Sequence, residues 1–346
     1  MPWKRASATA RALDLVKARQ RSRQPCGGAE VPSWVVPISL PTPYPIGPVT
    51  LYLLAGEPLT LVDTGPATAA AWGGLQQALA ARSLRPDDVR RVLITHGHHD
   101  HFGLAYRLSV LGAELLAHPH DRRNLALDRN YPMLWRQLGQ AGLPVFERLP
   151  LIAGLRLLDR TARPVADVTW LAAGQELPHE HGRIRVHHLP GHTPGHVGFE
   201  LCGEGVVVTG DTILDGLTPN AVVDTDPENP GKPFPSLAAY GATLARLEAM
   251  RPRLLLPAHG PCISDVAGQV SALREKQARR AAEVRAALSA APSTVATLIA
   301  RLFPGVTFLG TFLAFSEVLG HLLELERQGV VRRVSARRGE RWALAG

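Results

Sequence analysis

The side chains best suited to metal chemistry lie in one short run, residues 96–101, which reads HGHHDH. The run follows a short apolar segment, RVLIT at residues 91–95, that predicts a strand buried on both faces. A loop at the end of a strand can turn successive side chains toward one point, because no regular period forces them apart. Imidazole and carboxylate groups together bind borderline divalent ions such as zinc. His96 and His98 can therefore hold one ion while Asp100 and His101 reach a second.

Three further residues of ligand type follow predicted strands elsewhere in the chain. They lie in the segments PGHTPGH, TGDT and PAHGP, where neighbouring glycines let the backbone approach closely. The residues are His192, Asp211 and His259, after predicted strands at 184–189, 206–208 and 254–256. Four groups from one loop cannot complete two tetrahedral sites, so these three are the candidates for the missing ligands.

With Asp63 in the segment LVDTG, these motifs form an ordered set of five. On that set, residues 31–265 resemble the metallo-β-lactamase superfamily. The resemblance implies an α/β fold, a four-layer αβ/βα sandwich with two metal ions at one edge of the paired sheets. It also implies seven ligands. The first ion would be bound by His96, His98 and His192, and the second by Asp100, His101 and His259. Asp211 would bridge the two ions. Asp63 would then orient the histidine loop by hydrogen bonds.

The chemistry implied by this ligand set is hydrolysis. Two divalent ions about 3.5–4 Å apart bind a water between them and lower its pKa toward neutrality. The resulting hydroxide attacks a carbonyl carbon or a phosphorus atom, and one ion stabilises the charge that develops on the substrate. Asp100 and Asp211 can accept the proton of the water, so both are candidate catalytic residues. Zinc is the expected ion, with manganese or iron as alternatives, because these ligands tolerate all three.

The elements that position these residues alternate along the chain. Apolar runs bounded by turn residues predict strands within residues 34–117 and again within 184–257. Helical spacing predicts helices at 67–82 and 237–250, which suit the outer layers of a sheet-based fold. Between the two strand-rich halves, residues 121–149 read as a helical insertion over the sheet, either a substrate lid or an additional packing helix.

A length of 346 residues suits more than one domain. Residues 1–30 form a basic leader that lacks the apolar core of a secretory signal; a surface helix or tail is favoured over a transit peptide. Residues 31–271 form the predicted catalytic domain. Residues 272–346 contain three predicted helices, with Gly329 as a C-cap, and a hairpin, which is the outline of a winged-helix domain.

The overall composition is that of an ordinary globular protein, with 45% hydrophobic and 20% charged residues and a net charge of +8. No apolar run is long enough to span a bilayer, so we expect no membrane partner and a cytoplasmic location. Three cysteines without a CxxC spacing exclude a disulfide framework; Cys262 is expected to pack rather than ligate. The oligomeric state is not indicated.

Two parts of the chain resemble the lactamase-β-like branch that carries a C-terminal winged helix. The first is GDTIL with LTPN, which contains and follows Asp211, and the second is HLLEL with GV, in and after the last predicted helix. Some members of that branch cut single-stranded RNA and others act on thioesters. Our first hypothesis is a hydrolase of an ester, thioester or similar small acyl compound, since the aromatic residues Tyr131, Trp135 and Phe146 of the insertion suit an apolar acyl group.

Three alternatives stay open. The first is a phosphodiesterase or endoribonuclease acting on single-stranded RNA, because the hairpin carries basic residues that can bind phosphates, namely Arg332, Arg333, Arg337, Arg338 and Arg341. The second is a hydroxyacylglutathione-type thioesterase, although that family ends in a helical domain without a wing. The third is a non-catalytic nucleic-acid-binding protein. A secreted β-lactamase is disfavoured by the bridging Asp211 and the missing secretory signal.

The remaining histidines are expected to have other roles. His99 occupies the variable position of the motif and should point away from the ions. His196 should pack or hydrogen-bond below the site. His118 and His120 follow a predicted strand and can line the pocket.

Overall fold

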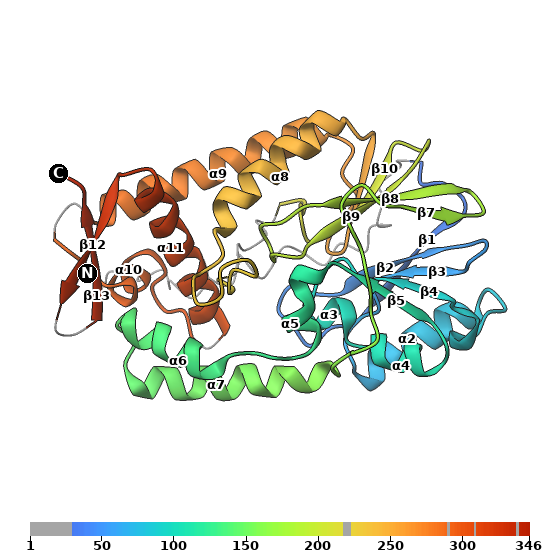
Figure 1. Ribbon diagram of the computed structural model, residues 1–346, viewed down its shortest axis with the longest axis horizontal. Coiled ribbons are helices and arrows are strands. Elements are labelled where there is room, and N and C mark those ends of the chain that lie inside the picture. The colour runs from blue at the N-terminus through green and yellow to red at the C-terminus, as the bar shows by residue number, and fades with distance from the viewer. Residues whose placement is uncertain (1–29, 217–222, 289–290, 308, 337–338) are drawn as a thin grey trace, which may run out of the picture. The chain divides into compact units, whose positions relative to one another are not determined.

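The computed structural model describes residues 30–216, 223–288, 291–307, 309–336 and 339–346 (Figure 1). Apart from Glu30, the predicted basic leader lies outside the described residues, as do the segment LTPN and the arginines at 337 and 338. The described residues form two compact units. The sandwich unit contains the residues up to Arg129 and Leu157–Arg274, and the helical unit contains Asn130–Arg156 and Glu275–Gly346.

The first sheet of the sandwich unit has the strand order β1-β2-β3-β4-β5-β6. Its strands are β1 (Val35–Leu40), β2 (Val49–Leu54), β3 (Thr60–Val62), β4 (Arg91–Leu93), β5 (Glu114–Ala117) and β6 (Thr169–Trp170). The pairings from β1 to β3 are antiparallel and those from β3 to β6 are parallel. The connections contain the helices α2 (Ala69–Ala80), α3 (His99–Phe102), α4 (Ala105–Val110) and α5 (Arg122–Leu125). The parallel half therefore ends its strands at one edge, where a site can assemble.

The second sheet has the strand order β11-β10-β9-β8-β7. Its strands are β7 (Glu176–His179), β8 (Gly182–His188), β9 (Val197–Leu201), β10 (Val206–Gly210) and β11 (Leu254–Pro257). Only the β10–β11 pairing is parallel among the pairings described for this sheet. Helix α8 (Ser236–Met250) connects β10 to β11 as a crossover, and α9 (Val266–Ala287) follows β11.

Side chains on alternate faces of the strands build three layers of core. Tyr52 in β2 and Val208 in β10 belong to the core between the two sheets. Their neighbours Leu53 and Val207 face outward, toward α2 and toward α8 and α9 respectively. The order of layers is helix, sheet, sheet and helix, which confirms the predicted four-layer αβ/βα fold.

The helical unit contains α6 (Tyr131–Gln140), most of α7 (Val145–Leu158), the end of α9, α10 (Val295–Leu302), α11 (Leu309–Arg327) and the hairpin β12 (Val331–Ala336) with β13 (Gly339–Leu344). Trp342 of the hairpin is fully buried and pairs its backbone with Ser293. The amide of Ala296 donates to the carbonyl of Ala141, the residue that follows α6, at 2.8 Å. The predicted insertion is thus helical, and α6 packs with the C-terminal elements. Its role as a lid and the winged-helix assignment stay predictions.

Within the part of the chain that the structure describes, no helix is long and apolar enough to cross a bilayer.

Candidate metal centre

The seven predicted ligands come from loops at the carboxyl ends of four strands. His96 and His98 follow β4, and Asp100 and His101 lie in the first turn of α3. The other three are His192 after β8, Asp211 after β10 and His259 after β11. The structure brings all seven together, in three overlapping groups of ligand atoms that lie within 4.8 Å of one another.

The first group contains three imidazoles, His96, His98 and His192. The Nδ1 atom of His98 lies 3.0 Å from Nε2 of His96 and 2.9 Å from Nε2 of His192. The three rings are nearly perpendicular to one another, with interplanar angles of 80°, 79° and 90°. Burial lowers the pKa of both His96 and His98 well below the ordinary value, so both rings are neutral and offer lone pairs. This is the geometry of a three-nitrogen cation site.

The other two groups share His101 and mix imidazoles with carboxylates, and together they form the second group. Nε2 of His259 lies 3.5 Å from Oδ2 of Asp100 and 3.7 Å from Oδ1 of Asp211. Nε2 of His101 lies 3.5 Å from Oδ2 of Asp211, which is also 3.6 Å from Nε2 of His192. Asp211 therefore lies between the two groups, in the place that a bridging ligand requires.

Several of these atoms are buried without a hydrogen-bond partner among the described residues. They are Nε2 of His101, Nε2 of His259 and Oδ1 of Asp211. Buried polar atoms are normally paired, because an unpaired one costs about 1–3 kcal/mol. Their convergence at distances longer than a hydrogen bond fits a site built for cations.

The charge balance of the second group also favours a cation. Burial opposes ionisation of Asp100, but the charge of His101 and the nearby ring of His259 lower its pKa to about 2. The pKa of Asp211 is likewise lowered, against burial, mainly by His259 and His101. Burial opposes a charge on His101 and His259, yet the surrounding carboxylates raise the pKa of both rings. Two ionised carboxylates here require positive charge, which protons or metal ions can supply.

Residues behind the ligands hold the rings in one orientation. Nδ1 of His101 donates to Oδ2 of Asp63 at 2.8 Å, and Nδ1 of His259 donates to the carbonyl of Pro48 at 2.9 Å. Each bond leaves Nε2 as the lone-pair atom that faces the site. Oδ1 of Asp63 also accepts from the amide of Thr95 at 2.8 Å, immediately before the histidine run. Asp63 has φ of 61°, a strained conformation of the kind that clusters at functional sites.

Two other histidines lie where the sequence predicts. The ring of His196 stacks on that of His96 at 4.6 Å and accepts a bond from the amide of Asp211. His99 turns to Arg129 and Asp159, at 3.1 Å and 3.4 Å from its Nε2. Neither belongs to a group of ligand atoms among the described residues.

Asp121 is a site residue that the sequence analysis missed. Its buried carboxylate accepts from the amide of Gly97 at 2.7 Å, the hydroxyl of Thr193 at 2.8 Å and the amide of Gly195 at 2.8 Å. It thereby connects the loop that contains His98 to the loop that contains His192. A Cβ at position 195 would lie 2.4 Å from the backbone nitrogen of Asp121, so this close approach requires glycine. The available signal was an aspartate that follows a predicted strand, as the ligands do.

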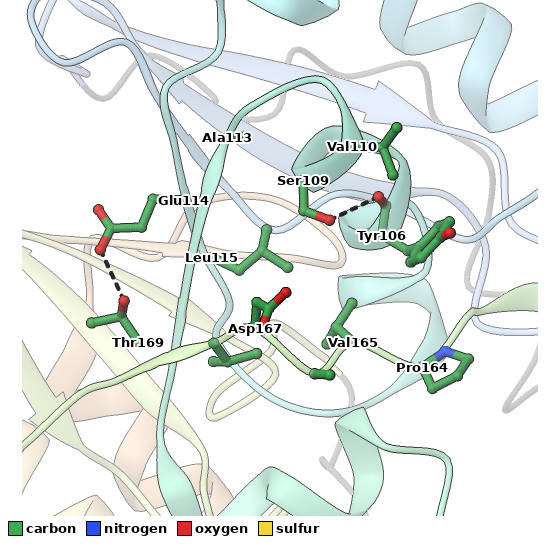
Figure 2. Close-up of a pocket in the computed structure, with 12 residues that line it drawn as sticks. Tyr106, Ser109, Val110, Ala113, Glu114, Leu115, Pro164, Val165, Asp167 and Thr169 are labelled. Carbon is green, nitrogen blue, oxygen red and sulfur yellow. Dashed lines mark hydrogen bonds between the residues drawn. The ribbon is translucent and has the colours of Figure 1, made fainter.

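A hollow of about 610 Å³ beside β5 contains none of the seven predicted ligands (Figure 2). It is lined by residues of α4, β5 and the segment before β6. Thr169 donates to Glu114 across part of it at 2.9 Å. The convergent side chains, rather than this hollow, define the candidate site.

Known proteins resemble this chain in sequence and in fold. The model of the metallo-beta-lactamase superfamily matches residues 44–259. Over 312 residues the chain is 28% identical to the probable metallo-hydrolase YqjP of Bacillus subtilis, covering 86% of this chain and 93% of that protein. The chain belongs to the metallo-β-lactamase superfamily and is a metallo-hydrolase, and its clustered histidines and aspartates indicate a dinuclear metal site.

One solved structure and one further curated relative are also similar to this chain. The crystal structure of a metallo-beta-lactamase family protein from Thermus thermophilus, TTHA1429, matches with a TM-score of 0.80 and 29% identity, covering 91% of this chain and all of that one (100%). The atrochrysone carboxyl ACP thioesterase of Aspergillus chevalieri is 27% identical over 244 residues, which cover 70% of this chain and 60% of that protein. The chain thus spans less than two thirds of that thioesterase.

Proposed function

We propose that this chain hydrolyses an ester or thioester of a small acyl compound, with two divalent ions, zinc in the first instance, held by the seven convergent side chains. The observation that carries this proposal is the group of buried, partnerless atoms of His101, His259 and Asp211 beside the three imidazoles. Buried polar atoms are normally paired, so we expect cations to lie between the members of this set.

The residues divide the work of the reaction. When bound, the two ions polarise the scissile carbonyl and lower the pKa of water. Asp100 is ionised at neutral pH, because its pKa is about 2, and so it can accept a proton from the attacking water. Asp211 has oxygens facing both groups of ligands and holds them at a fixed separation. Asp63 and Pro48 fix the ring orientations of His101 and His259, so that the site is preorganised.

An acyl substrate is supported by the named relative that is a thioesterase. The aromatic residues of the predicted insertion lend less support than the sequence suggests. The ring of Trp135 is covered by the guanidinium of Arg148 at 4.4 Å, and that of Tyr131 by Arg156 at 5.1 Å. Two of the three rings expected to contact an acyl group already have cationic partners within the helical unit.

The hairpin gives little support to the RNA alternative. Arg333 is paired with Glu326 at 3.0 Å and with Glu340 at 3.2 Å. Trp342, the aromatic residue that could stack on a base there, is 1% exposed. Of the hairpin arginines that the structure describes, Arg332 and Arg341 remain exposed on the strands and can still contact phosphates.

The experiment is a hydrolysis screen of the zinc-loaded chain against acyl thioesters, including acylglutathiones, and against esters, lactones and labelled single-stranded RNA. We expect turnover of a thioester or ester and its loss, by about three orders of magnitude or more, in Asp100→Asn. The matched control is Asp167→Asn, an exposed aspartate of the same unit, which should keep wild-type activity. RNA cleavage that depends on Asp100, with no acyl turnover, would refute the acyl proposal. Metal analysis of the purified chain decides between zinc, manganese and iron.

A further inference from the structure

Three histidines outside the dinuclear centre form a second compact group. His118 follows β5, His120 lies in the 3₁₀ turn Pro119–Asp121, and His188 is the last residue of β8. One ring nitrogen from each lies within 4.8 Å of the other two. His118 is buried and the other two are half-buried, so part of the group is accessible to solvent. None of the three is used by the proposed reaction.

His188 has the hydrogen bond of a metal ligand. Its Nε2 donates to the carbonyl of Pro194 at 2.8 Å, which leaves Nδ1 as the lone-pair atom. Histidines that bind metals usually donate their other ring nitrogen to a carbonyl or carboxylate in this way. The corresponding bonds in the dinuclear centre are those of His101 and His259.

The ring orientations show what must move when an ion binds. The ring of His120 is nearly perpendicular to those of His118 and His188, at 88° and 79°, as in the three-imidazole group of the main centre. His118 and His188, however, stack in parallel at 4.0 Å with an interplanar angle of 10°. A metal ion lies in the plane of each imidazole that binds it, so one ring of this pair has to turn. His118 is the freer ring, because its Nδ1 accepts only a long bond, 3.3 Å, from the amide of His120.

The surrounding charges favour a cation over protons. Burial lowers the pKa of His118 to about 3 and also lowers that of His188, so both rings are neutral at pH 7 and an ion displaces no proton from them. Oε1 of Glu228 lies 4.0 Å from Nε2 of His120, within reach of a shared ion. Arg246, which contacts the backbone oxygen of His188 at 3.4 Å, opposes this with one positive charge.

We propose that His118, His120 and His188 bind a third divalent ion of the zinc class, with the Glu228 carboxylate as a fourth ligand. Three imidazoles and one carboxylate are a tetrahedral ligand set suited to zinc. The ion would act on the dinuclear centre through two neighbours. Asp121, which holds both ligand loops, directly follows His120, and Pro194 lies in the loop that carries His192. The third ion is therefore a structural ion for the loops of the main centre.

The test counts ions rather than turnover, so it does not depend on the proposed reaction. The full chain is saturated with zinc, freed of excess metal and analysed for zinc per chain. We expect about three ions in the wild type and about two in His120→Asn and His188→Asn, because a site that loses one of three imidazoles loses most of its affinity. The matched control is His181→Asn, an exposed histidine that stacks on Trp34, which should keep the third ion.

Glu228→Gln guards against a folding defect, because Glu228 is 74% exposed. It should bind the third ion about tenfold or more weakly while the other two stay bound. In the copper-loaded wild type, the third ion should show nitrogen hyperfine coupling that His120→Asn removes. Two ions in the saturated wild type would overturn the proposal, as would a third ion retained equally by His120→Asn and His188→Asn.

Discussion

Single carboxylates decide how rigid the candidate centre is. Asp63 and Asp121 face the ligand loops from behind, and each accepts hydrogen bonds from groups that flank ligands. Asp63 acts on the ring of a ligand directly, whereas Asp121 acts on backbone amides and one hydroxyl. Charged acceptors are the stronger kind of hydrogen-bond partner, so removing either should loosen the site without removing a ligand.

Replacing Asp121 should separate positioning from ligation. Asp121→Ala leaves the amides of Gly97 and Gly195 without their acceptor, so we expect metal affinity to fall about 10- to 100-fold. Competition with a chromophoric chelator measures this. Asp121→Asn keeps the shape and one acceptor oxygen, so its metal affinity should lie between those of the wild type and Asp121→Ala. The exposed Asp167→Asn should have the metal affinity of the wild type. Unchanged affinity in Asp121→Ala would show that the loops hold themselves.

The same carboxylate should leave a signature in the pH dependence of stability. Burial raises the pKa of Asp121 to about 6, despite the bonds from Thr193 and Gly97 that act in the opposite direction. The folded chain therefore holds this proton more tightly than the unfolded chain. The contribution is present below about pH 4 and is lost as the pH rises through about 6, by about 1.4 kcal/mol for every tenfold difference in proton affinity between the folded and unfolded chain.

The measurement is the free energy of unfolding of the metal-free wild type minus that of Asp121→Asn, followed across this pH range. Taking the difference removes the titration of the other histidines and carboxylates. It should decrease as the pH rises from about 4 to about 6 and stay level above that. A difference that increases with pH would mean that the hydrogen bonds, rather than burial, dominate the pKa of Asp121.

At the scale of elements, the strands deliver the ligands and their connecting loops bring them together. The loop after β8 must pass so close to the turn at Asp121 that position 195 has no room for a side chain. The atom that a Cβ would meet there is a backbone nitrogen, which cannot move aside like a flexible side chain. We expect Gly195→Ala to shift this loop and His192 with it.

Gly195→Ala should therefore lower both metal affinity and the melting temperature, with a loss of about 1–3 kcal/mol for overpacking. Gly73→Ala in α2 is the same substitution at an open helical position, where nothing lies within 4 Å of the added Cβ. It should be neutral or stabilise by up to about 1 kcal/mol. Calorimetry and zinc titration of the two variants check this. Equal behaviour of the two would mean that the loop accommodates the methyl group.

The sequence predicted helices and strands best where the hydrophobic periodicity agreed with the positions of turn residues. Strand β2 (Val49–Leu54) lies within the segment 34–117, for which strands were predicted, and helix α10 lies within the segment 272–346, for which three helices were predicted. Strand β6 was missed because two residues carry no period, and β7 because Pro178 interrupts an edge strand. Asp121 was missed because its partners are mostly backbone amides, which no residue type reveals. All seven predicted ligands converge, since each motif contains both the ligand and the glycine or proline that shapes its loop.

At the scale of the whole molecule, the grouping of the insertion with the C-terminal elements is a tertiary fact. No local sequence pattern in residues 131–158 predicts that they pack with the hairpin. The amide of Ala296 donates to the carbonyl of Ala141, a residue more than a hundred positions earlier in the sequence. The ligands all lie in the sandwich unit, whereas α6, α10 and α11 lie in the helical unit. Metal binding and the packing of the helical unit are therefore expected to be separate contributions to stability.

Metal removal should reveal this separation. Without cations, the carboxylates of Asp100 and Asp211 both lie beside the ring of His259 in a buried site. Bound ions stabilise only the folded form of that unit, by about 2.7 kcal/mol at a free concentration a hundred times the dissociation constant. Calorimetric scans with chelator and with rising zinc should show two transitions, of which one moves upward with zinc. Asp211→Asn should flatten that response, while Glu283→Gln, a change at a half-buried position in the helical unit, should not. If both transitions move together with zinc, the two units unfold as one, and their structural separation has no thermodynamic counterpart.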